Sequence, residues 1–224
     1  MTKLTRKATG NGPGGSTTGS LEGDLGDEQL RLVGLIVLEW NEIEFLVSTI
    51  TYSAMGLPGE HWVTITSGLS FDSQRSIILN EAFKSIRLPE DFIKAIDRSF
   101  AAAKIAKQSR DGVTHARVTH GTLAIGMNFK RAAGTVHVQE TNLSASALSL
   151  LRDHLKIIRA EILASLNLVD MWKSAANWQM SQRPRIPTDE ETLAVTTELS
   201  EVLTRLTSLQ EERAKLEQNP AFPY

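Results

Sequence analysis

The chain has 224 residues and a formal net charge of −2, and 41% of its residues are apolar. That length allows one domain with appendages or two small domains, and the near-neutral charge argues against a general binder of polyanions. Because the chain has no cysteine, disulfides, thiolate zinc sites and cysteine nucleophiles are excluded.

The segment 1–26 is rich in Gly, Ser and Thr, and we expect a flexible tail because it cannot bury enough apolar surface. Its basic residues Lys3, Arg6 and Lys7 leave contact with RNA or an acidic surface as a second interpretation. No apolar stretch follows them, so no secretory signal is predicted, and no run reaches the ~20 apolar residues of a membrane helix. We therefore expect a soluble, cytoplasmic protein that does not enter a membrane.

A first helix is predicted from Asp27, a suitable N-cap, to about Ala54, ahead of Gly56 and Pro58. Its apolar residues cover more than one side of the helix: Leu32, Val33, Leu35, Ile36, Val37, Trp40, Ile43, Leu46, Val47 and Ile50. Such a helix is typical of the centre of a bundle, or of one shared with a second subunit.

Two further helices are predicted before the middle of the chain. The segment 71–86 has apolar residues at roughly helical spacing and a candidate cap in Asp72 or Ser73. The next helix begins near Pro89 with two acids in its first turn, as helix starts prefer. Its apolar residues are Phe92, Ile93, Ile96, Phe100, Ala103 and Ile105.

The pattern then changes from helical to alternating. A β-hairpin is predicted at about 122–140, where "TLAIGMNF" and "TVHVQE" flank "KRAAG". A fourth helix follows, capped by Ser144, with apolar residues spaced by three and four: Leu148, Leu151, Leu155, Ile158, Ile162 and Leu166. We expect Trp172 and Trp178 to pack against the C-terminal helix, and we interpret His61 and His154 as surface or boundary residues.

A linker and a last helix at about 188–217 complete the chain. The helix shows apolar residues at heptad-like steps, with Arg213 as the odd member. Two interpretations are open, a short coiled-coil seam or an amphipathic helix that docks on the bundle. The sequence thus predicts an all-α fold: a helical bundle at 27–180 with an inserted hairpin, and a C-terminal helical appendage at 181–224.

The stretch "SRDGVTHARVTHGT", residues 109–122, gathers basic residues and histidines between a helix and the hairpin. Between Lys104 and Arg131 the only acid is Asp111, against six basic residues: Lys104, Lys107, Arg110, Arg117, Lys130 and Arg131. A local charge of this kind can attract a polyanion even when the whole chain is slightly acidic. Basic residues also gather near a helix C-terminus to complement its dipole, which accounts for part of the cluster.

Arg110 and His115 offer two chemical functions that RNA cleavage without a metal requires. Arginine binds phosphate through two donors and stays charged, and histidine exchanges a proton near neutral pH. One group must deprotonate the 2′-hydroxyl, and a cation must stabilise the charge that grows on the phosphate. An Arg and a His so near in sequence are also common for structural reasons.

A zinc site is a further alternative, and it would need His115, His120, His137 and a carboxylate. The chain has no metal-ligand spacing such as HExxH, so we predict no metal. It also has no phosphate loop, nucleophile elbow or kinase motif, and we expect no cofactor.

"RDGVTH", residues 110–115, resembles the Arg-x4-His motif of the HEPN superfamily. The surroundings are similar too: "LEWNEIEFLVSTITYSAMG" resembles a HEPN first helix, and "SFDSQRSIILNEAF" the next. The long helix from Ser144 resembles the one after the motif. The resemblance covers about residues 28–170 and implies a HEPN-like four-helix bundle that forms a homodimer with two motifs facing each other.

The resemblance also implies a metal-independent endoribonuclease of toxin–antitoxin or antiphage systems, with an antitoxin or defence protein as partner. Arg110 would contact the scissile phosphate, and His115 would act as general base or acid or position the 2′-hydroxyl. Asp111 would orient one of them, and Glu44 is a candidate supporting acid. Substrate contacts are expected from Lys107, Arg117, His120, Lys130 and Arg131.

Other members of the superfamily have lost activity and serve as RNA-binding or assembly modules. A catalytically inactive helical dimer that binds RNA or a nucleotide is therefore the second hypothesis. The local basic cluster agrees with both hypotheses, and the Arg110–His115 pair distinguishes them.

Overall fold

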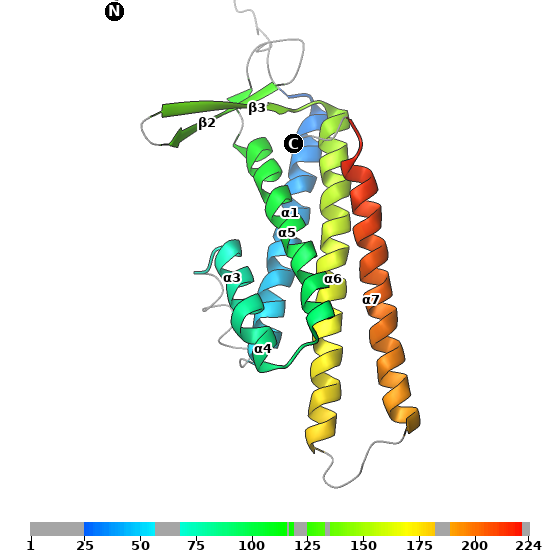
Figure 1. The fold of residues 1–224 in the computed structure, drawn as a ribbon. Helices are drawn as coiled ribbons and strands as arrows, with labels where there is room; N and C mark the ends of the chain where they lie inside the picture. The colour runs from blue at the N-terminus through cyan, green and yellow to red at the C-terminus, as the bar shows by residue number, and fades with distance from the viewer. Residues whose placement is uncertain are drawn as a thin grey trace, which may run out of the picture.

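The computed structural model describes residues 25–56, 68–115, 117–118, 125–132, 135–181 and 189–220. Side chains are described at 25–56, 68–115, 141–175 and 194–220. Most of the described chain is helical, in agreement with an all-α fold class. The long helices lie side by side, and two strands cross one end of the bundle (Figure 1). No helix in the described ranges is long and apolar enough to cross a membrane.

Helix α1, Asp27–Met55, begins and ends within one or two residues of its predicted bounds. Its N-cap is Gly26 instead of the predicted Asp27, because the Gln29 side chain accepts a hydrogen bond of 2.8 Å from the Gly26 N–H. Gly56 ends the helix in the left-handed conformation, at φ 63°, which favours glycine. The buried residues follow one face, and Leu38 on the opposite side is 61% exposed.

The next helical segment comprises α3 Phe71–Ile77, a π-helical turn Ile78–Ala82 and α4 Phe83–Ser85. Its cap is Ser70 and neither Asp72 nor Ser73, because the Ser70 hydroxyl accepts from the Ser73 N–H at 3.2 Å. In the π turn the Phe83 N–H donates to the Ile78 carbonyl, five residues back. The wider turn keeps Ile78, Ala82 and Phe83 all buried, although their spacing is not that of a regular helix.

Helix α5, Glu90–Thr114, starts after Pro89 and carries Glu90 and Asp91 in its first turn, as expected. It buries Ile96, Phe100 and Ala103 in the main core, whereas Ile105 is 46% exposed and is not a core residue. The helix continues through the basic stretch and ends at His115.

Three antiparallel strands follow in the order β1, β2, β3: Arg117–Val118, Ile125–Ala132 and Thr135–Asn142. The β2–β3 pair runs from Ile125 opposite Asn142 to Ala132 opposite Thr135. Arg117 in β1 lies opposite Met127 in β2. Both β2 and β3 contact α5, so the strands lie beside the end of that helix.

Helix α6, Ala145–Ser181, is capped by Ser144 as predicted, since the Ser144 hydroxyl accepts from the Ala147 N–H at 3.3 Å. The whole predicted apolar stripe of α6 is buried. Trp172 does not pack as predicted. Its Nε1–H donates to the Ile86 carbonyl at 2.9 Å, and its ring meets Phe92 edge-on at 6.2 Å, so it closes the α4–α5 corner. The side chain of Trp178 lies outside the described residues.

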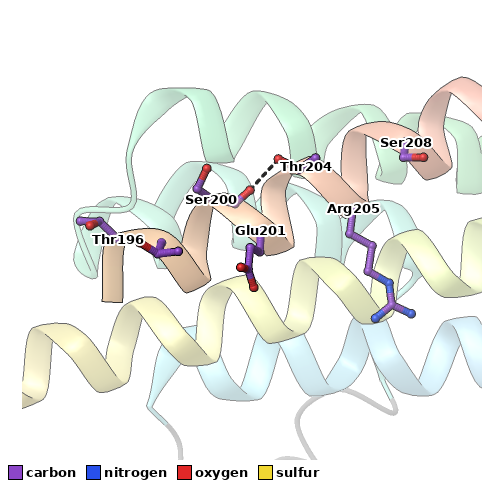
Figure 2. Close-up of a pocket in the computed structure, with 7 residues that line it drawn as sticks. Thr196, Ser200, Glu201, Thr204, Arg205 and Ser208 are labelled. Carbon is purple, nitrogen blue, oxygen red and sulfur yellow. Dashed lines mark hydrogen bonds between the residues drawn. The ribbon is translucent and has the colours of Figure 1, made fainter. Parts of the chain in front are cut away.

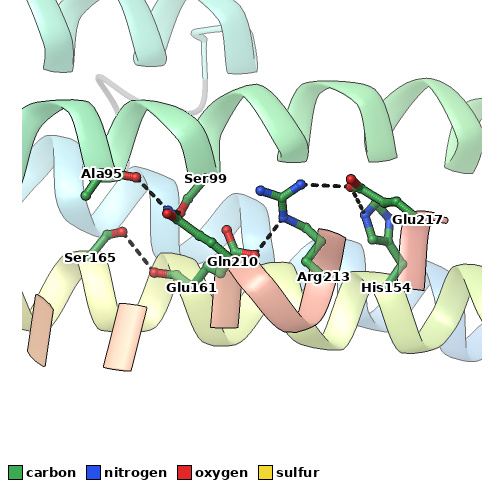
Figure 3. A network of polar contacts seen from close by, with 8 residues as sticks. All are labelled: Ala95, Ser99, His154, Glu161, Ser165, Gln210, Arg213 and Glu217. Atoms are coloured by element: carbon green, nitrogen blue, oxygen red, sulfur yellow. Dashed lines mark hydrogen bonds and ion pairs between the residues drawn. The ribbon is translucent and has the colours of Figure 1, made fainter. Parts of the chain in front are cut away.

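Helix α7, Asp189–Glu217, docks along α6, which confirms the second interpretation of this segment. Leu199 and Leu206 are buried in the two core clusters. Figure 3 shows the polar groups between the helices: Arg213 Nε lies 2.7 Å from Glu161 Oε1, and Arg213 Nη1 lies 2.8 Å from Glu217 Oε1.

His154 belongs to the same network and is 1% exposed, so its interpretation as a surface or boundary residue is wrong. Its Nε2 lies 2.8 Å from Glu217 Oε1, and α7 covers it. Gln210 on α7 donates to both the Ala95 carbonyl and the Ser99 hydroxyl of α5. The polar residues of α7 therefore attach it to two helices of the bundle.

Candidate functional site

The C-terminal end of α5 holds an arginine against an aromatic ring. The Cζ atom of Arg110 lies 6.0 Å from the ring centroid of Trp40, which α1 contributes and which is fully buried. Phe71 packs on Trp40 at 5.7 Å, and Phe100 packs on Phe71 at 6.4 Å. A cation over an aromatic face is attracted to it, and this ring is fixed by the core, so the guanidinium has a defined position.

Asp111 bridges the two cations nearest to it. Its Oδ1 lies 2.8 Å from Arg110 Nη1, and its Oδ2 lies 2.9 Å from Lys107 Nζ. Burial favours a higher pKa for the Asp111 carboxyl, but the hydrogen bonds and charges of Lys107 and Arg110 outweigh it, and the pKa lies below its ordinary value. Asp111 is therefore an anion at neutral pH.

His115 stands at the position where α5 ends. Its backbone N–H donates to the Asp111 carbonyl at 3.1 Å, and its side chain is exposed. The preceding residue, Thr114, donates its hydroxyl to the Arg110 carbonyl at 3.0 Å. Among the described side chains no hydrogen bond joins Arg110 to His115, although both stand in the last turns of one helix.

Two buried donors at this site have no acceptor within the described part of the chain: Arg110 Nε and Trp40 Nε1. They belong to the two groups that stack on each other. A buried N–H without an acceptor is costly, and such groups commonly mark a place where water or an ion binds. The site therefore has donors to spare beyond the one that Asp111 occupies.

The remaining predicted site residues are placed less closely. The Glu44 side chain is exposed. The backbones of Arg117, Lys130 and Arg131 lie in β1 and β2, which puts them on the sheet beside α5. Their side chains, like those of His120 and His137, lie outside the described residues. The described side chains include no group of three metal-ligating residues.

Two features of the site were not identified from the sequence. The first is the contact of Arg110 with Trp40, which joins residues far apart in the chain and has no local signal. The second is the bridge from Lys107 through Asp111 to Arg110. Its signal is present, because Lys107 and Asp111 are four positions apart and lie on one face of a helix.

A second concave region lies on the outer face of α7, as an open hollow of about 590 Å³. Figure 2 shows its lining, which is mostly hydroxyl side chains together with Glu201 and Arg205. The Thr204 hydroxyl donates to the Ser200 carbonyl of its own helix at 2.8 Å. Hydroxyls on the surface of a helix are ordinary, so the end of α5 is the stronger candidate.

Comparison of the chain with protein-family models, with curated proteins and with solved structures finds no match.

Proposed function

We propose that the end of α5 binds an RNA phosphate and that the protein is a metal-independent endoribonuclease of HEPN type. The observation that carries the proposal is the Arg110 guanidinium, which stacks on the buried Trp40 and keeps a buried Nε donor without an acceptor in the described chain. An arginine fixed in this way suits a phosphate, because its donors match phosphate oxygens and its charge does not titrate.

The proposed reaction needs no group outside the chain and the RNA. The 2′-oxygen attacks phosphorus and loses its proton, the bond from phosphorus to the 5′-oxygen breaks, and that oxygen takes up a proton. The products are a 2′,3′-cyclic phosphate and a 5′-hydroxyl. His115 exchanges one of these protons, and Arg110 stabilises the charge that develops on the phosphate oxygens.

The charge around the site supports RNA as the substrate. Lys107 lies within the Asp111 bridge, and the backbones of Arg117, Lys130 and Arg131 lie on the adjoining sheet. Several cations along one surface contact several phosphates of a strand, and their contribution weakens as salt rises. The proposal includes a homodimer with the two α5 ends facing each other, and an antitoxin or defence protein as its partner.

A second function is favoured by one observation. Asp111 places a negative charge between the two cations that a scissile phosphate would need. If that bridge persists when RNA binds, the site holds the strand without stabilising the transition state. The protein would then be an RNA-binding or assembly module without nuclease activity.

The test is cleavage of a structured RNA in EDTA by the wild type and by Arg110→Ala and His115→Ala. We expect cleavage by the wild type only, with 2′,3′-cyclic phosphate ends and a loss of about 100-fold or more in each variant. Arg98→Ala is the matched control, because it removes an exposed cation from the same helix and should leave the rate unchanged. Retention of full activity by both site variants would contradict the assignment.

The same experiment separates the second function. If the folded wild type retains RNA on a filter but cleaves none of the RNAs offered, the non-cleaving module is supported. A cleavage reaction that EDTA abolishes would argue against both, since neither uses a metal.

A further inference from the structure

Asp111 is poorly placed to stabilise the helix on which it lies. It stands in the last turn of α5, where the helix dipole disfavours a negative charge. Its partner Lys107 precedes it by four residues, which is the less favourable order for such an ion pair. The stability of α5 therefore does not explain an acid at this position.

The geometry of Asp111 resembles that of a bound anion. Each carboxylate oxygen takes one donor from a different cation, Oδ1 from Arg110 and Oδ2 from Lys107. A phosphate group also offers two oxygens to two donors, and arginine binds carboxylate and phosphate with the same fork. The side chains of Lys107 and Asp111 are 38% and 33% exposed, so a ligand in solution can reach both.

We propose that Asp111 is an internal competitor that occupies the phosphate donors of Lys107 and Arg110 until an RNA strand displaces it. This inference rests on the proposed RNA site and adds its regulation. A single phosphate must replace the carboxylate with little net gain. A strand gains further contacts along the sheet beside α5, so the site selects polynucleotides over mononucleotides and free phosphate.

Displacement requires only a side-chain movement. Asp111 lies at the solvent edge, and its removal from the cations needs a change of rotamer while α5 stays intact. Arg110 keeps its contact with Trp40 in either case, because that contact uses the face of the guanidinium. The buried Trp40 thus holds the cation in place while its anion is exchanged.

The experiment compares wild type, Asp111→Asn and Asp111→Ser in binding a fluorescein-labelled 12-mer of 2′-O-methyluridine, followed by anisotropy in EDTA at low salt. The 2′-O-methyl group prevents cleavage of the probe, so that binding alone is measured. We expect both variants to bind about tenfold more tightly than the wild type, because a neutral side chain neither repels the phosphate nor holds the cations. Asp91→Asn, an equal charge change at the exposed start of α5, should bind as the wild type does.

Inorganic phosphate provides the second measurement. It should displace the 12-mer from Asp111→Asn at a lower concentration, relative to the affinity of the 12-mer, than from the wild type. Both variants should melt within a few degrees of the wild type, since each removes a charge that the helix dipole disfavours.

The outcomes separate the inference from the function on which it rests. If the wild type binds the 12-mer and the Asp111 variants bind equally or more weakly, the internal competitor is wrong and the RNA site stands. If no form of the protein binds the 12-mer at low salt, the proposed function fails and the competitor with it. Tighter binding by Asp91→Asn as well would attribute the effect to net charge and overturn the assignment to Asp111.

Discussion

Two arginines of this bundle show how burial decides what a cation does. Arg213 is 13% exposed and meets Glu161, which is fully buried, and Glu217. Arg110 is 21% exposed, meets one carboxylate and keeps a donor without an acceptor in the described chain. A buried cation with two anions is committed to the fold, whereas a cation at the edge with a spare donor remains able to bind a ligand.

His154 makes the stability of the protein depend on pH. Burial lowers its pKa below the ordinary value of 6.5, and the positive charge of Arg213 adds to this, although Glu217 acts in the opposite direction. The unfolded chain therefore binds a proton at a higher pH than the native state does. The stability that neutral His154 provides is complete above about pH 6.5 and is lost as the pH falls through its lowered native pKa.

We predict that His154→Gln weakens this dependence. The urea midpoint of the wild type should fall between about pH 7.5 and about pH 5.5, and that of the variant should fall less. Burial raises the pKa of Glu161, which favours the native state on acidification, but this effect is common to both proteins. His115→Gln, which removes an exposed histidine, is the control, and parallel curves for wild type and His154→Gln would contradict the prediction.

At the scale of elements, α6 is the helix that organises the bundle. One face carries the apolar stripe against α1 and α5, and a second face carries His154, Glu161 and Ser165 under α7. The second face was not recognised in the sequence, because buried polar residues have the same letters as exposed ones. Arg213, the odd member of the α7 stripe, is the matching group.

We predict that Arg213→Met destabilises the protein by about 3 kcal/mol, because it leaves the Glu161 carboxylate buried without its cation. The double variant Arg213→Met/Glu161→Gln should recover most of that loss, since no charge then remains buried without a partner. Arg205→Met, an exposed arginine on the same helix, should change stability by less than about 0.5 kcal/mol. Urea denaturation followed by circular dichroism measures all three, and equal losses in the single and double variants would argue against a buried charge as the cause.

At the scale of the whole molecule, α7 shares its core with the rest of the bundle. Leu199 belongs to the main hydrophobic cluster, and Leu206 packs with Ala95 of α5 and Ala164 of α6. The helix also donates from Gln210 to the Ala95 carbonyl. These contacts make α7 part of a common folding unit.

A matched pair of probes tests this cooperativity. All four tryptophans lie outside α7, at positions 40, 62, 172 and 178, so fluorescence reports on the remainder of the chain. Circular dichroism reports on all helices, including α7. We expect the two unfolding curves to coincide, and an earlier transition in circular dichroism alone would mean that α7 unfolds separately.

The resemblance of 110–115 to the HEPN motif and the local charge both come from the sequence, and they directed attention to one end of α5. The positions of Arg110 and Asp111 relative to Trp40 and Lys107 come from packing. The caps show the same division. Ser144 was predicted correctly, whereas Ser70 and Gly26 displaced nearby residues of equally suitable type, because capping depends on backbone conformation at a single position.

The sequence by itself determined where the long helices lie, since their apolar stripes repeat at the helical period and their ends carry helix-breaking or capping residues. It also determined that α7 has an apolar face and that the basic residues gather near residue 110. Only the tertiary structure decided which polar residues are buried, that Trp172 closes the α4–α5 corner, and that Asp111 bridges two cations beside Trp40. The physical reason is that periodicity is a property of neighbours in the chain, whereas ion pairs and ring contacts form between groups that only packing brings together.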